Sequence, residues 1–223
     1  MLNSSKINGR MLYMERKVIL FDLDGTLTDS GEGITNCARL ALEHFGICVG
    51  DLRHFVGPPL RDSFLKAGVP EDGVEEAIAV YRSRYNTVGK YENVPYPGIR
   101  EVLETLQAQG HRLFVATSKP ETISVDILQK FDLCKYFERV CGATFDRSRD
   151  TKASVIAYLL EQIGTCDRII MVGDTAYDVI GAAAHRIPTV GVSWGYGNVE
   201  EMKQCGAAAI AHTMDELLFL LQR

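Results

Sequence analysis

Short apolar runs alternate with helical segments through most of this chain, and this alternation limits the folds that it can adopt. The apolar runs are residues 18–21, 112–116, 168–172, 188–192 and 208–211, with a weaker one at 138–142. Between and after them we expect helices over residues 121–130, 151–163, 176–186 and 214–221. Continuously apolar strands separated by helices are typical of a parallel sheet covered on both faces. The sequence therefore predicts an α/β fold.

The stretch from residue 30 to residue 96 interrupts this alternation. It has helical periodicity instead, with apolar residues on one face at Ile34, Ala38, Leu42 and Phe45 and on another at Val74, Ile78 and Tyr81. Pro and Gly residues at 57–59 and 95–98 separate its helices and close the segment. We expect a Rossmann-like core made of residues 17–29 and 97–223, an inserted α-helical domain at 30–96, and a flexible N-terminal extension at 1–16.

Length and composition exclude several classes of function. The chain has 223 residues, enough for one domain that carries an insertion, and 46% of them are hydrophobic. The net charge of −5 argues against nucleic acid as a partner. No apolar run approaches the roughly 18 residues of a membrane span, and the N-terminus lacks the apolar centre of a signal peptide. We therefore expect no contact with a membrane.

The six cysteines show no spacing typical of metal sites. We interpret them as reduced thiols of a cytoplasmic protein, because disulfides are rare in that compartment. Nothing in the sequence requires a partner chain, so we expect a monomer or a weak homo-oligomer.

Two aspartates, Asp22 and Asp24, directly follow the first apolar run. Burying carboxylates without a partner is costly, so this pair needs a compensating cation. Mg²⁺, which prefers oxygen ligands, is the natural one. Gly25 and Thr26 come next, a residue that can turn sharply and one with a short hydroxyl donor. The segment predicts a metal site at the end of a buried strand.

Polar residues also follow two later strands. Thr117 and Ser118 come after the second strand, and Asp174 comes after residues 168–172, with Asp178 four residues on. The carboxyl ends of parallel strands face the same crevice, where ligands bind. Acids gathered there without a histidine favour Mg²⁺ over zinc. Lys152, at the start of a helix, would supply the positive charge that an anionic substrate requires.

Together these segments resemble the four motifs of the haloacid dehalogenase superfamily of phosphohydrolases. D-L-D-G-T-L-T-D at 22–29 resembles the first motif and T-S-K at 117–119 the second. Lys152 is placed like the lysine of the third motif, and G-D-T-A-Y-D at 173–178 resembles the fourth. The similarity extends from Lys17 to the C-terminus. The insertion is similar to the helical cap of the branch that contains phosphoglycolate phosphatase and β-phosphoglucomutase. The strings F-V-G-P-P-L at 55–60 and S-R-D-T-K-A at 148–153 look most like the phosphoglycolate phosphatase and 5′-nucleotidase-like members.

The resemblance implies an Mg²⁺-dependent phosphatase acting on a small phosphorylated metabolite, a phosphoglycolate-like or 5′-nucleotide-like monoester. It implies that Asp22 attacks phosphorus to form an aspartyl-phosphate and that Asp24 is the general acid and base. Thr117 and Lys152 would bind the phosphoryl group. The implied Mg²⁺ ligands are Asp22, Asp174 and the backbone carbonyl of Asp24. Binding of the phosphate or support of the site would fall to Gly25, Thr26, Ser118 and Asp178.

Two alternatives remain open. A phosphomutase of the β-phosphoglucomutase type shares the fold, metal and nucleophile, and differs in keeping water from the phospho-aspartate. A non-catalytic phosphate-binding regulatory module would carry the same motifs without turnover. Two further features are interpreted as structural rather than as substrate contacts. We interpret Lys119-Pro120 as a strand end followed by a helix start, and Arg53, His54 and Arg61 as a solvated helix face.

Overall fold

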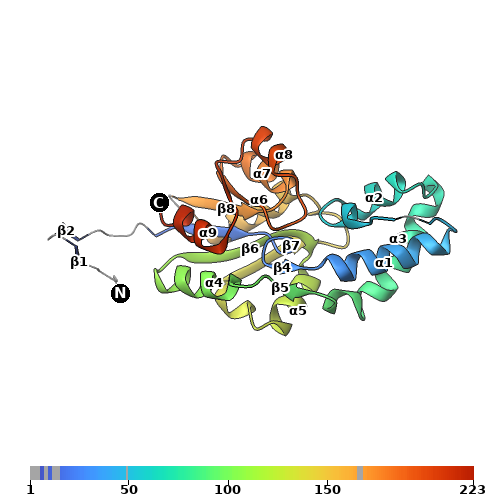
Figure 1. The fold of residues 1–223 in the computed structure, drawn as a ribbon, viewed down its shortest axis with the longest axis horizontal. Coiled ribbons are helices and arrows are strands. Elements are labelled where there is room, and N and C mark those ends of the chain that lie inside the picture. Colours follow the sequence, from blue (N-terminus) through green and yellow to red (C-terminus); the bar gives the residue numbers. More distant parts are fainter. Residues whose placement is uncertain (1–5, 8–9, 12–15, 49, 165–167) are drawn as a thin grey trace.

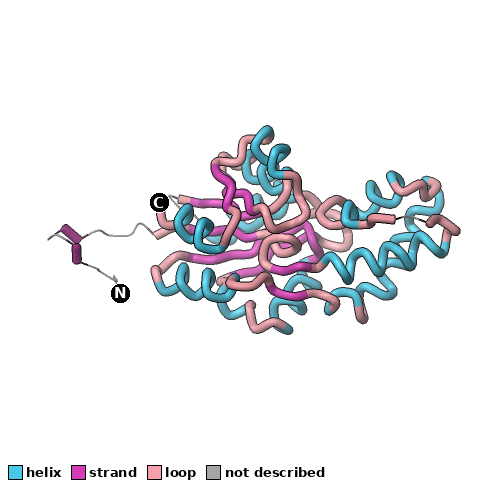
Figure 2. The backbone as a smooth tube through the Cα atoms, in the orientation of Figure 1, coloured by secondary structure: helices cyan, strands magenta, loops and turns pink. Residues whose placement is uncertain are grey.

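The computed structural model describes residues 6–7, 10–11, 16–48, 50–164 and 168–223, and its centre is a six-stranded sheet. All pairings in this sheet are parallel, and the strand order is β10-β9-β8-β3-β6-β7. Figures 1 and 2 show the strands inside the molecule with helices around them. The strands are β3 (Val18–Phe21), β6 (Arg112–Pro120), β7 (Arg139–Ala143), β8 (Ile169–Gly173), β9 (Thr189–Val192) and β10 (Ala209–Ala211). Each apolar run of the sequence forms one of these strands, so the predicted α/β fold is confirmed.

Helices cover both faces of the sheet (Figure 1). Ile19 and Phe21 share an apolar cluster with α4 (Ile99–Ala108), α5 (Glu121–Lys130) and α9 (Met214–Leu221). The alternate residues Val18 and Leu20 share a second cluster with α6 (Lys152–Ile163) and α7 (Ala176–Ala183). Successive side chains of a strand point to opposite faces, so β3 is buried on both sides. The short α8 (Val199–Gln204) packs beside α7 and β9.

Three elements of the core differ from the sequence-based expectation. Strand β6 continues beyond Ala116 to Pro120, because a shift in its pairing with β7 lets the polar residues extend the strand. Helix α7 ends at Ala183, three residues early, and Arg186 beyond it has a positive φ of 58°. Helix α4 was not anticipated, although its buried residues Ile99, Val102, Leu103 and Leu106 have helical spacing.

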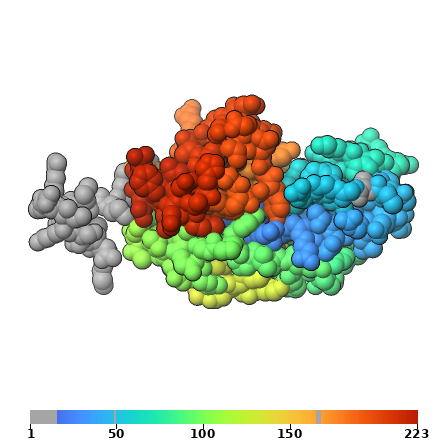
Figure 3. All heavy atoms as spheres, in the orientation of Figure 1, coloured from blue at the N-terminus to red at the C-terminus, as the bar shows by residue number. Residues whose placement is uncertain are grey.

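The expected helical segment leaves the sheet region after β4 (Thr28–Asp29) and returns through β5 (Val94–Pro95), and these two short strands pair antiparallel. Its helices are α1 (Gly31–His44), α2 (Leu60–Lys66) and α3 (Val74–Tyr85), with 3-10 helices at Arg53–Phe55, Glu71–Gly73 and Gly89–Tyr91. A further 3-10 helix, Cys134–Tyr136, lies in the core. In the space-filling view the helical segment forms one end of the molecule (Figure 3). Helices α1 and α3 pack together and bury Ile34, Ala38 and Leu42.

Most of the N-terminal extension expected at residues 1–16 lies outside the described residues. Within it, β1 (Lys6–Ile7) and β2 (Arg10–Met11) pair antiparallel. Among the residues that the structure describes, no helix combines the length and the apolar character needed to cross a membrane.

Candidate active site

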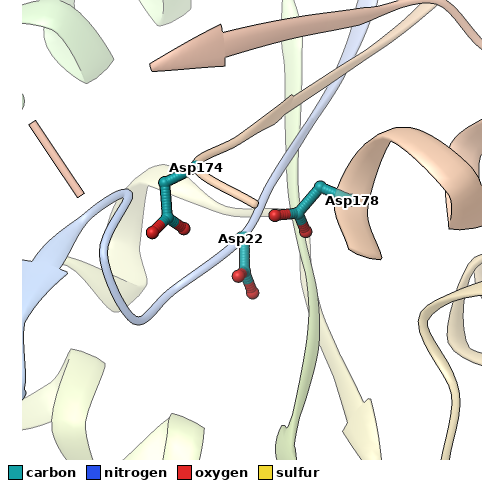
Figure 4. Close-up of side chains that lie close together, drawn as sticks. All are labelled: Asp22, Asp174 and Asp178. Atoms are coloured by element: carbon teal, nitrogen blue, oxygen red, sulfur yellow. The ribbon is translucent and has the colours of Figure 1, made fainter. Parts of the chain in front are cut away.

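Three buried aspartates meet at the carboxyl ends of the central strands (Figure 4). Asp22 directly follows β3, and its N–H donates to the carbonyl of Val172 in β8 at 2.9 Å. Asp174 directly follows β8, and Asp178 lies in the first turn of α7. One carboxylate oxygen of each lies within 4.8 Å of the others. The sheet thus brings together residues that are about 150 positions apart in sequence.

Lys152 places a buried ammonium against this cluster. Its Nζ lies 2.7 Å from Asp22 Oδ1 and 2.7 Å from Asp178 Oδ1, and it donates to the carbonyl of Ala116 at 2.9 Å. Lys152 is the first residue of α6 and is only 5% exposed. Burial acts to lower the pKa of Lys152, but the charges of Asp178 and Asp22 outweigh it, and the pKa is raised. The side chain therefore stays cationic and joins the two carboxylates.

The cluster has more negative than positive charge, and its donor set suits a divalent cation. Burial raises the pKa of Asp22 to about 6 although Lys152 opposes this shift. Burial, together with the charges of Asp178 and Asp22, also raises the pKa of Asp174 well above its usual range. Asp174 accepts hydrogen bonds from the Tyr196 N–H (2.9 Å) and the Thr26 hydroxyl (3.2 Å), which are both neutral. Three buried carboxylates with one ammonium can hold a metal ion that prefers oxygen ligands.

Two glycines allow loops to pack directly on Asp174. Gly25 has a φ of +81°, and a Cβ there would lie 2.1 Å from Asp174 Oδ2. A Cβ at Gly195 would lie 2.3 Å from the same oxygen. The neighbouring Trp194 donates from its indole nitrogen to the carbonyl of Thr26 at 3.2 Å. The loop at 194–197 therefore packs directly against the Asp174 carboxylate.

The Asp24 carboxylate pairs with Lys119 and is not one of the three clustered acids. Its Oδ2 lies 2.5 Å from Lys119 Nζ, and the Lys119 side chain is 7% exposed. A metal-binding role for Asp24 would thus rest on its backbone carbonyl, as the family resemblance implies. Lys119 does more than end a strand and start a helix, because it is the ion-pair partner of a predicted site residue.

A cavity of about 510 Å³ lies between the core and the helical segment. Asp22, Asp24, Thr117, Ser118 and Lys152 line it on the core side. Tyr81, Arg82 and Tyr85 of α3 line it on the opposite side. Thr117 acts to lower the pKa of Asp22, which favours the ionised carboxylate. The predicted nucleophile and phosphate-binding residues therefore share one cavity with residues of the helical segment.

Sequence reasoning missed Lys119, Tyr85 and Arg82 as site residues. The positions of Tyr85 and Arg82 depend on how the helical segment sits over the core. The position of the Lys119 ammonium depends on the direction of a side chain in β6. No local pattern carries either kind of information. The two arginines that we interpreted as part of a solvated helix face each pair with an acid. Arg53 lies 2.8 Å from Asp51, and Arg61 lies 2.9 Å from Glu71. Arg61 also lines the cavity.

A parallel α/β sheet with buried aspartates at its strand ends and a helical segment over them defines a class of phosphoryl-handling hydrolases. The family described as haloacid dehalogenase-like hydrolase matches residues 19–192, and the chain belongs to this family. A tyrosine-protein kinase, PtkA, of Mycobacterium tuberculosis is 44% identical over 207 residues, covering 90% of this chain and 71% of that protein.

Other relatives are named as phosphatases. A 5′-nucleotidase of Pseudomonas aeruginosa is 40% identical over 190 residues, covering 83% of this chain and 86% of that protein. A phosphoglycolate phosphatase of Agrobacterium fabrum is 31% identical, covering 81% and 82%. The crystal structure of a predicted phosphatase from Clostridium acetobutylicum aligns with a TM-score of 0.88 at 43% identity, covering 92% of this chain and 98% of that one. The protein is thus a phosphatase-type hydrolase of the phosphoglycolate phosphatase-like branch.

Proposed function

We propose that this protein is an Mg²⁺-dependent phosphatase that hydrolyses a small phosphomonoester through an aspartyl-phosphate on Asp22. The observation that carries the proposal is the buried cluster of Asp22, Asp174 and Asp178 around Lys152, adjoining a cavity of about 510 Å³. The names of the relatives support a phosphoglycolate-like or 5′-nucleotide-like substrate.

The chain's own residues can supply both chemical steps. A carboxylate oxygen of Asp22 attacks phosphorus and the bond to the leaving oxygen breaks. Asp24 enters this step as the protonated acid and donates its proton to that oxygen. Water then attacks the phosphorus, Asp24 accepts its proton, and the bond to Asp22 breaks to release phosphate. Thr117, Ser118 and Lys152 bind the phosphoryl oxygens.

Asp22, Asp174 and the backbone carbonyl of Asp24 would hold Mg²⁺, with Asp178 supporting them through its contact with Lys152. When bound, the ion supplies positive charge that offsets the repulsion between the carboxylates and a dianionic phosphate.

We propose that residues 30–96 form a cap domain on the core formed by 17–29 and 97–223. Its side chains in the cavity would select the substrate, and its closure would exclude water until the aspartyl-phosphate has formed. The five described cysteines are free, which supports a location in the reducing cytoplasm.

The test is phosphate release from phosphoglycolate, 5′-nucleotides and sugar phosphates, with Mg²⁺ and with EDTA. Wild type is compared with Asp22→Asn and with Asp126→Asn, which removes a carboxylate that pairs with Lys90 outside the acid cluster. We expect release that requires both Mg²⁺ and Asp22 and that Asp126→Asn leaves intact. Activity that survives in Asp22→Asn would contradict the nucleophile assignment.

Detection of the phospho-aspartate, phosphate binding and transfer from ATP would separate the remaining candidates. A persistent phospho-aspartate without phosphate release supports the phosphomutase. Binding of phosphate without turnover supports a non-catalytic module. The 44% identity to a protein named as a tyrosine kinase makes phosphoryl transfer to tyrosine a second candidate, tested with labelled ATP and a tyrosine-containing peptide.

A further inference from the structure

Lys119 is in contact with both parts of the molecule at the cavity. Its Nζ lies 2.5 Å from Asp24 Oδ2 and 4.8 Å from the centre of the Tyr85 ring in α3. The side chains of Lys119 and Asp24 are 7% and 14% exposed. This near-complete burial shields the ion pair from solvent, so it restrains Asp24 more than a surface pair would.

The two oxygens of Asp24 have different surroundings. Lys119 holds Oδ2, whereas Oδ1 is buried and has no hydrogen-bond partner in the described part of the chain. Asp24 lines the cavity, so its carboxyl borders the space that a substrate would occupy.

The backbone around Lys119 is held in place. Lys119 belongs to β6, in the part of the strand where the pairing with β7 shifts. Its N–H donates to the Thr117 hydroxyl at 3.3 Å. The ammonium is therefore presented by a strand rather than by a loose loop, which favours precise placement.

We propose that Lys119 is a positioning residue that holds the Asp24 carboxyl at the cavity, where it exchanges a proton with the leaving oxygen of the substrate. The Tyr85 ring packs against the ammonium and limits its movement. This inference rests on the proposed phosphatase function, in which Asp24 transfers the proton. It goes beyond that function by assigning the orientation of Asp24 to a specific lysine.

The proposal has a consequence that a purely structural lysine would not have. Proton donation matters most when the leaving group is a poor one, such as an alkoxide, and least for p-nitrophenolate. If Asp24 is misplaced, formation of the aspartyl-phosphate should slow for alkyl phosphates far more than for p-nitrophenyl phosphate.

The experiment compares kcat/KM for an alkyl phosphate and for p-nitrophenyl phosphate in Lys119→Met, Lys119→Arg and wild type. Lys90→Met is the matched control. Lys90 also lies 2.5 Å from a carboxylate (Asp126) and 4.9 Å from a tyrosine ring (Tyr91), but outside this cavity. Thermal unfolding of each variant establishes that it is folded.

We expect Lys119→Met to lose roughly 10²-fold in kcat/KM with the alkyl phosphate and less than roughly tenfold with the aryl phosphate. Lys119→Arg keeps the cation and should recover much of the difference, and Lys90→Met should behave like wild type. Equal losses on both substrates, or no loss, in folded Lys119→Met would overturn the inference. Failure of wild type to hydrolyse either ester would instead overturn the proposed phosphatase function.

Discussion

At the scale of single residues, Gly25 is a position where the site leaves no room for a side chain. It combines a φ of +81° with a neighbouring carboxylate 2.1 Å from where a Cβ would lie. Gly46 offers a comparison, because its φ is +68° and nothing lies within 4 Å of its Cβ position. The two glycines thus share the backbone strain that a side chain would cause but differ in the contact with Asp174.

We predict that Gly25→Ala abolishes phosphatase activity, whereas Gly46→Ala preserves it. Both variants should lose roughly 1–2 kcal/mol of stability from the left-handed backbone conformation. Gly25→Ala should lose more, because Asp174 must move to make room. Urea unfolding and phosphate release measured on both proteins check this, and full activity in Gly25→Ala would contradict it.

At the scale of elements, the start of helix α7 and the acid cluster share one carboxylate. The N–H of Thr175 and its hydroxyl donate to Asp178 Oδ2 at 3.1 and 2.9 Å. Asp178 Oδ1 lies 2.7 Å from Lys152 Nζ. Thr175, at the start of α7, therefore also orients Asp178, which contacts Lys152.

We predict that Thr175→Ala loses about 1 kcal/mol of stability, as expected for a helix-start residue. Because it also loosens Asp178, activity should fall roughly 10–100-fold. Thr213, whose side chain accepts from the Glu216 N–H at the start of α9, provides the control. Thr213→Ala should lose similar stability with unchanged activity. Equal activity in the two variants would show that the start of α7 has no influence on the active site.

At the scale of the whole molecule, the parallel sheet was predictable and the arrangement over the cavity was not. Runs such as Val18–Phe21 are apolar on both faces, which already requires covering helices on two sides. The proximity of Asp22 and Asp174 could be predicted, because both residues follow the carboxyl ends of parallel strands. The Lys119–Asp24 pair could not be predicted in this way. It depends on the direction of the Lys119 side chain, in the part of β6 where the pairing with β7 shifts. The contact with Tyr85 depends on long-range packing of the helical segment.

The excess negative charge of the cluster also affects the stability of the entire fold. We predict that Mg²⁺ at about a hundredfold excess over its Kd stabilises the protein by about 2.7 kcal/mol. For a chain of this size that is a rise in Tm of roughly 5–10 °C. EDTA should reverse the rise.

Thermal unfolding of variants checks whether this stabilisation arises at the cluster. Asp174→Asn should show no rise in Tm with Mg²⁺, whereas Asp126→Asn should respond like wild type. A NaCl control at equal ionic strength accounts for general screening. A rise of the same size in Asp174→Asn would place the responsible ion elsewhere.

The order of the strands along the chain also determines which parts of the fold can form first during synthesis. Strand β3 is made before both of its neighbours in the sheet, which are residues 112–115 and 169–172. At a synthesis rate of about 5–20 residues per second, the second neighbour follows β3 after roughly 8–30 s. Before the first neighbour is made, the apolar strand that precedes Asp22 has no strand to pair with. The packing of α1 against α3 needs only nearby chain, so the helical segment can form on the ribosome well before the active site exists.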